Sequence, residues 1–160
     1  MIVTYHSLAA IRARYVDKKI VLTSGTFDLL HVGHVRYLNG VKSYGDIVVV
    51  MLSGDDRIKA RKGPQRPIIP ESDRAQMLNA LKVVDYVFLD PSKLPPDQID
   101  PIHAHVVASL QPNTYVTDGE DIRFSSIMDK TKVAILPRAD SGEHASTTAI
   151  IAHIIASLPD

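Results

Sequence analysis

Two histidines three residues apart, in a stretch that contains two glycines, are the residues of this sequence best suited to chemistry. The stretch reads Gly25-Thr26-Phe27-Asp28-Leu29-Leu30-His31-Val32-Gly33-His34 and follows an apolar, β-branched segment. Gly25 allows a tight turn, and the backbone N–H groups after it can face an anion. His31 and His34 begin a predicted helix, where both rings can share one face and negative charge is favoured. The stretch therefore predicts a phosphate site that could stabilise a transferring phosphoryl group.

A basic segment follows the second predicted strand. It carries Arg57, Lys59, Arg61, Lys62 and Arg66, with no acidic residue among them. Gly63 and Pro64 interrupt it, so we expect a loop. Placed at the end of a strand, this loop could fold over a polyphosphate, because Lys and Arg donate charge-assisted hydrogen bonds to phosphate oxygens.

Two further polar segments follow the fourth and fifth predicted strands. The first contains Asp118, Glu120 and Asp121, three carboxylates that could cap a helix or approach Mg²⁺, although Mg²⁺ more often binds through the triphosphate itself. The second is Ser146-Thr147-Thr148 at a predicted helix start, where hydroxyls and unbonded N–H groups can bind phosphate.

Each feature also has a structural explanation. An isolated histidine at His31 or His34 would more often cap the helix or pack under a loop. A run of positive charges is usually a solvated face, and a Ser-Thr-Thr helix start is usually an ordinary N-cap. The combination of these features after successive strands favours the phosphate site.

The elements that position these residues alternate along the chain. Short β-branched runs predict strands at residues 19–24, 46–52, 84–89, 114–117 and 132–136. Helical patterns cover residues 8–15, 32–44, 72–81, 101–110 and 146–158. This alternation predicts an α/β fold, a Rossmann-like parallel sheet of about five strands with helices on both faces. Ligands in such sheets bind beyond the carboxyl ends of the strands. We expect an N-terminal helical extension over residues 1–18 and a single domain over residues 19–160.

Composition excludes several classes of protein. The chain has 160 residues, 45% of them hydrophobic, and a formal net charge of zero. The neutral balance argues against a broadly basic nucleic-acid binder. Cysteine is absent, which excludes disulfides, thiolate zinc sites and cysteine nucleophiles. No signal peptide or membrane-length apolar run is evident, so we expect a cytoplasmic protein that binds neither membranes nor nucleic acids.

The pattern Gly-Thr-Phe-Asp-x-x-His-x-Gly-His resembles the signature of the cytidylyltransferase-like nucleotidyltransferases. The resemblance implies transfer of a nucleoside monophosphate from a nucleoside triphosphate, accompanied by Mg²⁺, to a phosphorylated small-molecule acceptor, with release of pyrophosphate. It implies that the backbone at Thr26 and Phe27 meets the α-phosphate. It also implies that His31 and His34 stabilise the transition state, and that residues 146–148 form the family's second nucleotide motif. A homodimer is a further expectation from the family.

The resemblance extends to the basic loop and the region after it. The family has a catalytic lysine in this loop, similar to Lys59 or Lys62, and the form Lys-Gly-x-x-Arg-Pro favours Lys62. Arg74 matches an arginine common in the family and is expected at the nucleotide site. Glu120 stands where relatives place an Asp against the nucleotide.

Residues 66–85 look like the adenylyltransferase branches, and most like heptose-1-phosphate adenylyltransferase. This favours ATP and a sugar phosphate such as D-glycero-D-manno-heptose 1-phosphate. Heptose enzymes tend to have a lysine where Thr117 stands, a departure that bears on the acceptor. The alternatives are CTP with glycerol 3-phosphate or another alcohol phosphate, ATP with FMN, and a nucleotide-binding regulatory module without catalysis.

Overall fold

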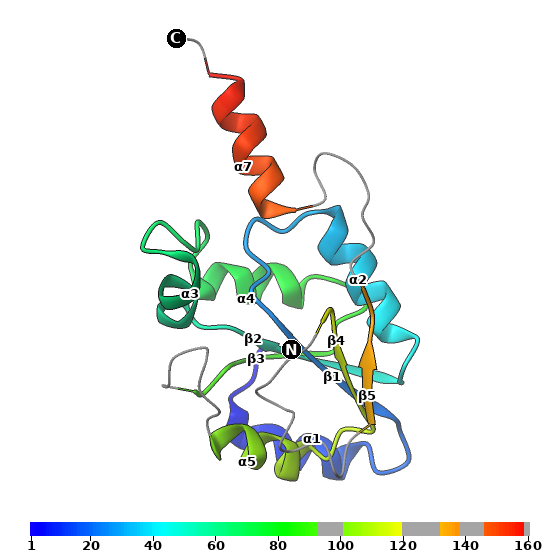
Figure 1. Ribbon diagram of the computed structural model, residues 1–160. Coiled ribbons are helices and arrows are strands. Elements are labelled where there is room, and N and C mark those ends of the chain that lie inside the picture. Colours follow the sequence, from blue (N-terminus) through cyan, green and yellow to red (C-terminus); the bar gives the residue numbers. More distant parts are fainter. Residues whose placement is uncertain (93–100, 120–131, 138–145, 159–160) are drawn as a thin grey trace.

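The fold is a parallel sheet between two layers of helices, seen in a computed structural model (Figure 1). The structure describes residues 1–92, 101–119, 132–137 and 146–158. The strands are β1 (Ile20–Gly25), β2 (Ile47–Leu52), β3 (Tyr86–Leu89), β4 (Thr114–Thr117) and β5 (Lys132–Ile135). All neighbouring strands run parallel, in the order β3-β2-β1-β4-β5. The predicted Rossmann-like α/β fold is therefore confirmed.

Helices cover both faces of this sheet. They are η1 (Tyr5–Ser7), α1 (Leu8–Arg14), α2 (Val32–Lys42), α3 (Asp55–Lys62), α4 (Glu71–Asn79), α5 (Pro101–Leu110) and α7 (Thr147–Ala156). Figure 1 shows α1 and α5 on one side of the sheet and α2 and α4 on the other. Successive side chains of a strand point to opposite faces of the sheet. In β1, Ile20 and Leu22 pack with α1 and α5, whereas Val21 packs with α2 and α4. This double burial explains why β2 and the first half of β1 are wholly apolar.

The N-terminal segment shares the core of the sheet. Leu8 and Ile11 of α1 are buried in the same cluster as the apolar face of α5. Ahead of α1, Ile2 pairs with Val87 of the edge strand β3, and the Val3 N–H donates to the Val87 carbonyl oxygen at 2.9 Å. These contacts cover the edge of β3 and bring residues 2–6 close to its carboxyl end.

Two segments differ from a simple reading of the sequence. The basic segment was predicted as a loop, but its first part is α3, which begins directly after β2 with Asp55 and Asp56 in its first turn. Acidic residues there stabilise the start of a helix, and Gly63 ends it with φ of 93°. The apolar helix α7 points away from the sheet in Figure 1, and Thr147 is its buried residue. In the part of the chain that is described, no helix has the length and hydropathy to cross a bilayer.

The strand order places a switch point at the middle of the sheet. The chain leaves β1 toward β2 on one side, and β4 later pairs with β1 on the other. The connections that leave β1 and β4 diverge there and open a crevice at the carboxyl ends of these strands. Gly25 and Thr26 stand at the end of β1, and Asp118 follows β4, so the predicted phosphate site lies in this crevice.

Candidate active site

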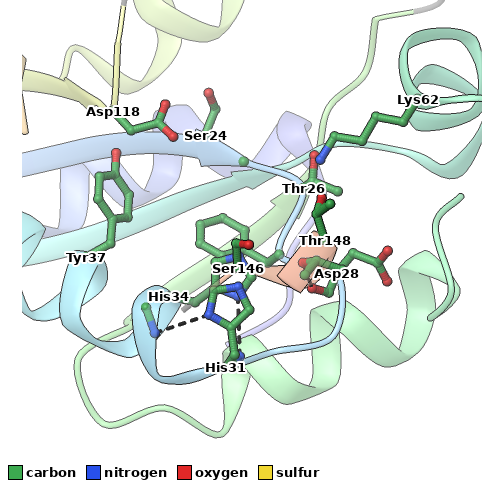
Figure 2. Close-up of a pocket in the computed structure, with 14 residues that line it drawn as sticks. Ser24, Thr26, Asp28, His31, His34, Tyr37, Lys62, Asp118, Ser146 and Thr148 are labelled. Carbon is green, nitrogen blue, oxygen red and sulfur yellow. Dashed lines mark hydrogen bonds between the residues drawn. The ribbon is translucent and has the colours of Figure 1, made fainter. Parts of the chain in front are cut away.

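A pocket opens at the carboxyl ends of β1 and β4 (Figure 2). Its walls come from the turn after β1, the first turns of α2, the end of α3, the residue after β4 and the start of α7. The lining residues are Ser24, Gly25, Thr26, Phe27, Asp28, His31, Gly33, His34, Tyr37, Lys62, Asp118, Ser146, Thr147 and Thr148. The cavity holds about 80 Å³, well below the roughly 300–1,000 Å³ of typical small-molecule sites, so its described walls suit a phosphate group.

The turn after β1 is held in an uncommon backbone conformation. Phe27 and Leu29 have φ of 49° and 47°, in the left-handed region that non-glycine residues seldom occupy. Position 25 has no room for a side chain, because a Cβ there would lie 2.7 Å from the Phe27 ring. Glycine is therefore required at this position for space rather than for its own backbone conformation. The Phe27 ring is buried, and its edge therefore presses against the bare backbone of Gly25. The result is a fixed turn whose backbone lines the pocket.

His31 and His34 form the start of helix α2 and stack on each other. Their ring centroids are 3.8 Å apart with an interplanar angle of 27°. The Gly33 N–H donates to His31 Nδ1 at 3.1 Å, and the His31 N–H points to His34 Nδ1 at 3.4 Å (Figure 2). Because Nδ1 accepts in each ring, the ring proton of the neutral imidazole sits on Nε2. Each histidine thus carries an Nε2–H donor, the group that a phosphoryl oxygen would need.

Asp28 connects the turn to two distant segments. Its carboxylate is 1% exposed and accepts hydrogen bonds from Arg66 Nε at 2.9 Å and from the Ile68 and Ile69 N–H groups at 3.0 Å. Arg66 Nη2 also lies 2.8 Å from the same carboxylate. On the backbone side, the Asp28 carbonyl oxygen accepts from Thr147 Oγ1 at 2.7 Å. Asp28 therefore fixes the histidine turn to the loop before α4 and to the start of α7.

The ionisation of Asp28 follows from these contacts. Burial alone would raise the pKa of Asp28, because it disfavours the charged form. The N–H groups of Ile69 and Ile68 and the Arg66 guanidinium outweigh burial and hold the pKa of Asp28 below its ordinary value. Asp28 is thus a permanently charged anchor at neutral pH. The sequence motif contains this residue, but its role depends on partners 38 to 41 residues away.

The basic segment divides between the pocket and the protein interior. Lys62 lines the pocket, and Figure 2 shows its side chain reaching toward Thr26. Lys59 lies outside the pocket lining and pairs with Asp56 at 3.6 Å on the surface. Arg61 Nη2 donates to Thr26 Oγ1 at 2.8 Å. Of the two candidate lysines, the geometry brings Lys62 to the site.

Two other arginines that follow β2 in sequence are structural. Arg57 is buried and ion-paired with Asp90 at 3.7 Å, away from the pocket. Arg74, expected at the nucleotide, is fully buried and absent from the pocket lining, which corrects that expectation. Its guanidinium donates to the carbonyl oxygens of Thr26 at 2.5 Å and Ser53 at 3.0 Å, and to Asp55 at 2.6 Å. Arg74 therefore ties the ends of β1 and β2 together beneath the site.

The Ser-Thr-Thr motif is placed at the pocket. Ser146 is the N-cap of α7, where its Oγ accepts from the Ala149 N–H at 3.1 Å. Thr147 is buried and bonded to Asp28, whereas Thr148 is exposed on the pocket wall. The motif thus serves both as an ordinary cap and as a pocket wall that carries hydroxyls. Glu120 lies outside the described residues.

Tyr37 is a pocket residue that the sequence reasoning missed. Its hydroxyl lies 2.8 Å from Thr23 Oγ1 and donates to the Val116 carbonyl oxygen at 3.1 Å, which joins α2 to β1 and β4. A usable signal was present, because positions 31, 34 and 37 follow each other at helical spacing on one face. Ser24 was likewise missed; its hydroxyl lies 2.7 Å from the Tyr115 hydroxyl.

The arrangement can bind and stabilise a phosphoryl group. The stacked rings of His31 and His34, together with Lys62, Ser146 and Thr148, line one small cavity at the N-termini of α2 and α7. Each of these groups favours negative charge. Within the described residues, no group of three or more His, Asp or Glu is placed to hold a metal ion.

Comparison with known proteins agrees with this geometry. The family profile described as cytidylyltransferase-like matches residues 22–153. The chain is 40% identical over 124 residues to a bifunctional protein HldE of Aliarcobacter butzleri, which covers 78% of this chain and 25% of the relative. It is 36% identical over 152 residues to the HldE of Sulfurimonas denitrificans, covering 94% of this chain and 30% of the relative. The chain thus spans a quarter to a third of the length of these curated relatives.

Solved structures show the same fold. A lipopolysaccharide core biosynthesis protein from Thermoplasma volcanium aligns with a TM-score of 0.60 and 27% identity, over 77% of this chain and 99% of that one. A pantoate-beta-alanine ligase from Francisella tularensis aligns with a TM-score of 0.59 at 17% identity, over 86% of this chain and 66% of that one, a likeness of fold alone. A family match over this much of the sequence shows that the chain belongs to the cytidylyltransferase-like family.

Proposed function

We propose that this chain is an adenylyltransferase that transfers AMP from ATP to a sugar phosphate, such as D-glycero-D-manno-heptose 1-phosphate, and releases pyrophosphate. The observation that carries the reaction class is the stacked pair His31 and His34, whose rings line the same cavity as Lys62. Similarity to proteins named HldE, and of residues 66–85 to heptose-1-phosphate adenylyltransferases, supports the choice of acceptor.

The chain's own groups would act mainly by position and charge. An oxygen of the acceptor phosphate attacks the α-phosphorus in line, and the bond from that phosphorus to the oxygen of the β-phosphate breaks. Pyrophosphate leaves with the bonding electron pair. The attacking oxygen is already ionised at neutral pH, so no general base is needed. His31 and His34 donate to the oxygens of the α-phosphoryl group as their charge grows, and Lys62 neutralises the departing phosphates.

Mg²⁺ fits this site as a companion of the triphosphate. The two described pocket carboxylates are Asp28, which is held by Arg66 and two backbone N–H groups, and Asp118, which is exposed. In nucleotide enzymes, Mg²⁺ is usually bound by one or two protein carboxylates together with the phosphates of the substrate. When bound, Mg²⁺ would neutralise charge on the triphosphate, and Asp118 is the residue that could contact it.

The test is pyrophosphate release across ATP, CTP, GTP and UTP, each with a panel of phosphorylated sugars, alcohols and FMN. We expect release with ATP and a sugar phosphate. The His34→Ala variant should lose turnover by about 10²–10³-fold and retain part of its ATP binding, because a donor acting on the transition state is removed. His105→Ala is the matched control, because His105 is exposed on α5 at the opposite face of the sheet.

The outcomes separate the alternatives. Activity with CTP alone would replace ATP as the donor and point to an alcohol phosphate as acceptor. Activity with FMN alone would replace the sugar phosphate. ATP binding without pyrophosphate release from any pair would overturn the enzyme proposal and favour a regulatory nucleotide-binding module.

A further inference from the structure

Lys62 reaches the phosphate pocket from a helix end that the protein core does not hold. The buried residues of α3 are Arg57 and Ile58, and every residue from Lys59 to Lys62 is exposed. Gly63 then ends the helix with φ of 93°. Burial of side chains is what usually fixes a helix in place, and in α3 it stops about one turn before Lys62. A polar contact must therefore set the position of Lys62.

Arg61 bonds this exposed helix end to the wall of the pocket. Its Nη2 atom donates to Thr26 Oγ1 at 2.8 Å, between residues 35 positions apart in the sequence. Arg61 directly precedes Lys62, whose side chain reaches toward Thr26 in Figure 2. The hydrogen bond thus joins the last turn of α3 to the turn after β1, which lines the pocket.

Thr26 is a rigid point of attachment for Arg61. The Thr26 carbonyl oxygen accepts from Arg74 Nη1 at 2.5 Å, and the Arg74 side chain is fully buried. The next residue, Phe27, is also buried, with its ring against Gly25. Because the backbone on both sides of the Thr26 side chain is held, its hydroxyl offers Arg61 an acceptor in a fixed place.

The other end of α3 is fixed in the protein interior. Arg57 lies one turn before Arg61 on the same face of the helix, and its Nε is 3.7 Å from a carboxylate oxygen of Asp90. The other oxygen of Asp90 lies 2.9 Å from His103 Nε2 of α5, and both of these side chains are buried. Asp90 follows β3 and Thr26 follows β1, with β2 between them. Two arginines on one face therefore attach α3 across the carboxyl edge of the sheet.

We propose that Arg61 is a positioning residue, whose hydrogen bond to Thr26 holds the last turn of α3 so that Lys62 lies at the phosphate pocket. The inference rests on the proposed function, in which Lys62 neutralises the departing phosphates. Arg61 lies outside the described lining of the pocket, so it acts through Lys62. A cation that is in place before the reaction stabilises developing charge without a reorganisation step.

The kinetic test measures Arg61→Ala in two backgrounds. We expect it to lower kcat/KM for ATP by about fivefold or more in the otherwise unmodified chain and by less than about twofold in Lys62→Ala, because the effect passes through Lys62. Lys59→Ala is the matched control, since it removes an exposed cation from the same helix and should change kcat/KM by less than about twofold. An equal loss in both backgrounds would overturn the proposal, because Arg61 would then act on the substrate itself. Unchanged kinetics of Arg61→Ala would overturn it as well.

A second measurement does not depend on turnover. The chain has no cysteine, so Ala60→Cys on α3 and Asn39→Cys on α2 provide two exposed sites for spin labels. Pulsed electron paramagnetic resonance then gives the distribution of distances between the two helices. We expect Arg61→Ala to broaden this distribution, and Thr26→Val, which removes the acceptor and keeps the branched shape, to broaden it to the same extent.

The two measurements separate this inference from the proposed function. A distance distribution that is the same with and without Arg61 would overturn the positioning role, even in an active enzyme. A broader distribution in both variants would support the attachment of α3 through Arg61 and Thr26. Absence of pyrophosphate release from the unmodified protein would count against the proposed function, whatever the distances show.

Discussion

Replacement of Asp28 by asparagine tests whether one buried carboxylate holds the active site together. The side chain is 1% exposed and accepts from the Arg66 guanidinium and from the Ile68 and Ile69 N–H groups. The asparagine amide would keep one acceptor oxygen but would turn an N–H₂ donor toward groups that also donate. The Arg66 side chain, 13% exposed, would lose its negative partner.

The expected cost can be worked from these contacts. Removal of one partner from a buried ion pair costs about 3–5 kcal/mol, and a hydrogen bond to a charged group contributes about 1.5–3 kcal/mol. Because Arg66 retains some solvent, we expect the lower part of the range, about 3 kcal/mol of unfolding free energy for Asp28→Asn. The measurement is urea denaturation at pH 7. Asp17→Asn, at an exposed position, should change stability by less than about 0.5 kcal/mol.

A double-mutant cycle and a pH series check the mechanism. Because the folded pKa of Asp28 lies below its ordinary value of 3.8, its ionised form stabilises the protein above that pH. This stability is lost as the pH falls through 3.8 toward the folded pKa, and the loss should be smaller in Asp28→Asn. The effect of Asp28→Asn should also shrink in an Arg66→Met background. A cost below about 1 kcal/mol, or the same cost with and without Arg66, would refute the reasoning.

Two further predictions concern the remaining pocket contacts. Lys62→Ala should lower kcat/KM for ATP by about tenfold or more. Lys59→Ala removes only an exposed ion pair with Asp56, so its kcat/KM should stay within about twofold of the unmodified value. Steady-state kinetics of the two variants measures both effects, and equal losses would contradict the placement of Lys62. Thr147→Val should lower the free energy of unfolding, measured by urea denaturation, by about 1–2 kcal/mol, because the Asp28 carbonyl oxygen loses its 2.7 Å hydrogen bond. An unchanged free energy of unfolding would mean that this contact does not hold the start of α7.

The fold could be predicted from the sequence because its signals are local. The strand at residues 114–117 and the helix at residues 101–110 have the predicted bounds. The alternation of strands and helices suffices to predict the parallel sheet. The helix α3 was missed because its first turn is acidic and its last turn basic, so it shows little apolar periodicity. Asp55 and Asp56 at its N-terminus and the cations at its C-terminus were a charge signal for a helix.

The site was only partly predictable because charge pairing is not local. The histidines and the Ser-Thr-Thr motif reach the pocket as their positions after strands indicate. The basic run suggested a common role for its cations, yet Arg57 and Arg66 turn to Asp90 and Asp28, at sequence distances of 33 and 38 residues. Arg74 likewise meets partners on three different segments. The number of charges in one segment does not tell where those partners lie, because the fold determines their positions.

The contacts at the start of helix α2 limit which residue types can function at position 31. The residue must accept the Gly33 N–H to cap the helix, stack on His34, and present a donor to a phosphoryl group. Serine, threonine, asparagine and aspartate cap well but offer no aromatic ring. Lysine and arginine donate to phosphate but have no acceptor atom for the cap. Histidine alone among the common side chains meets all three demands, so invariance at this position would reflect the folding of α2 as much as the chemistry.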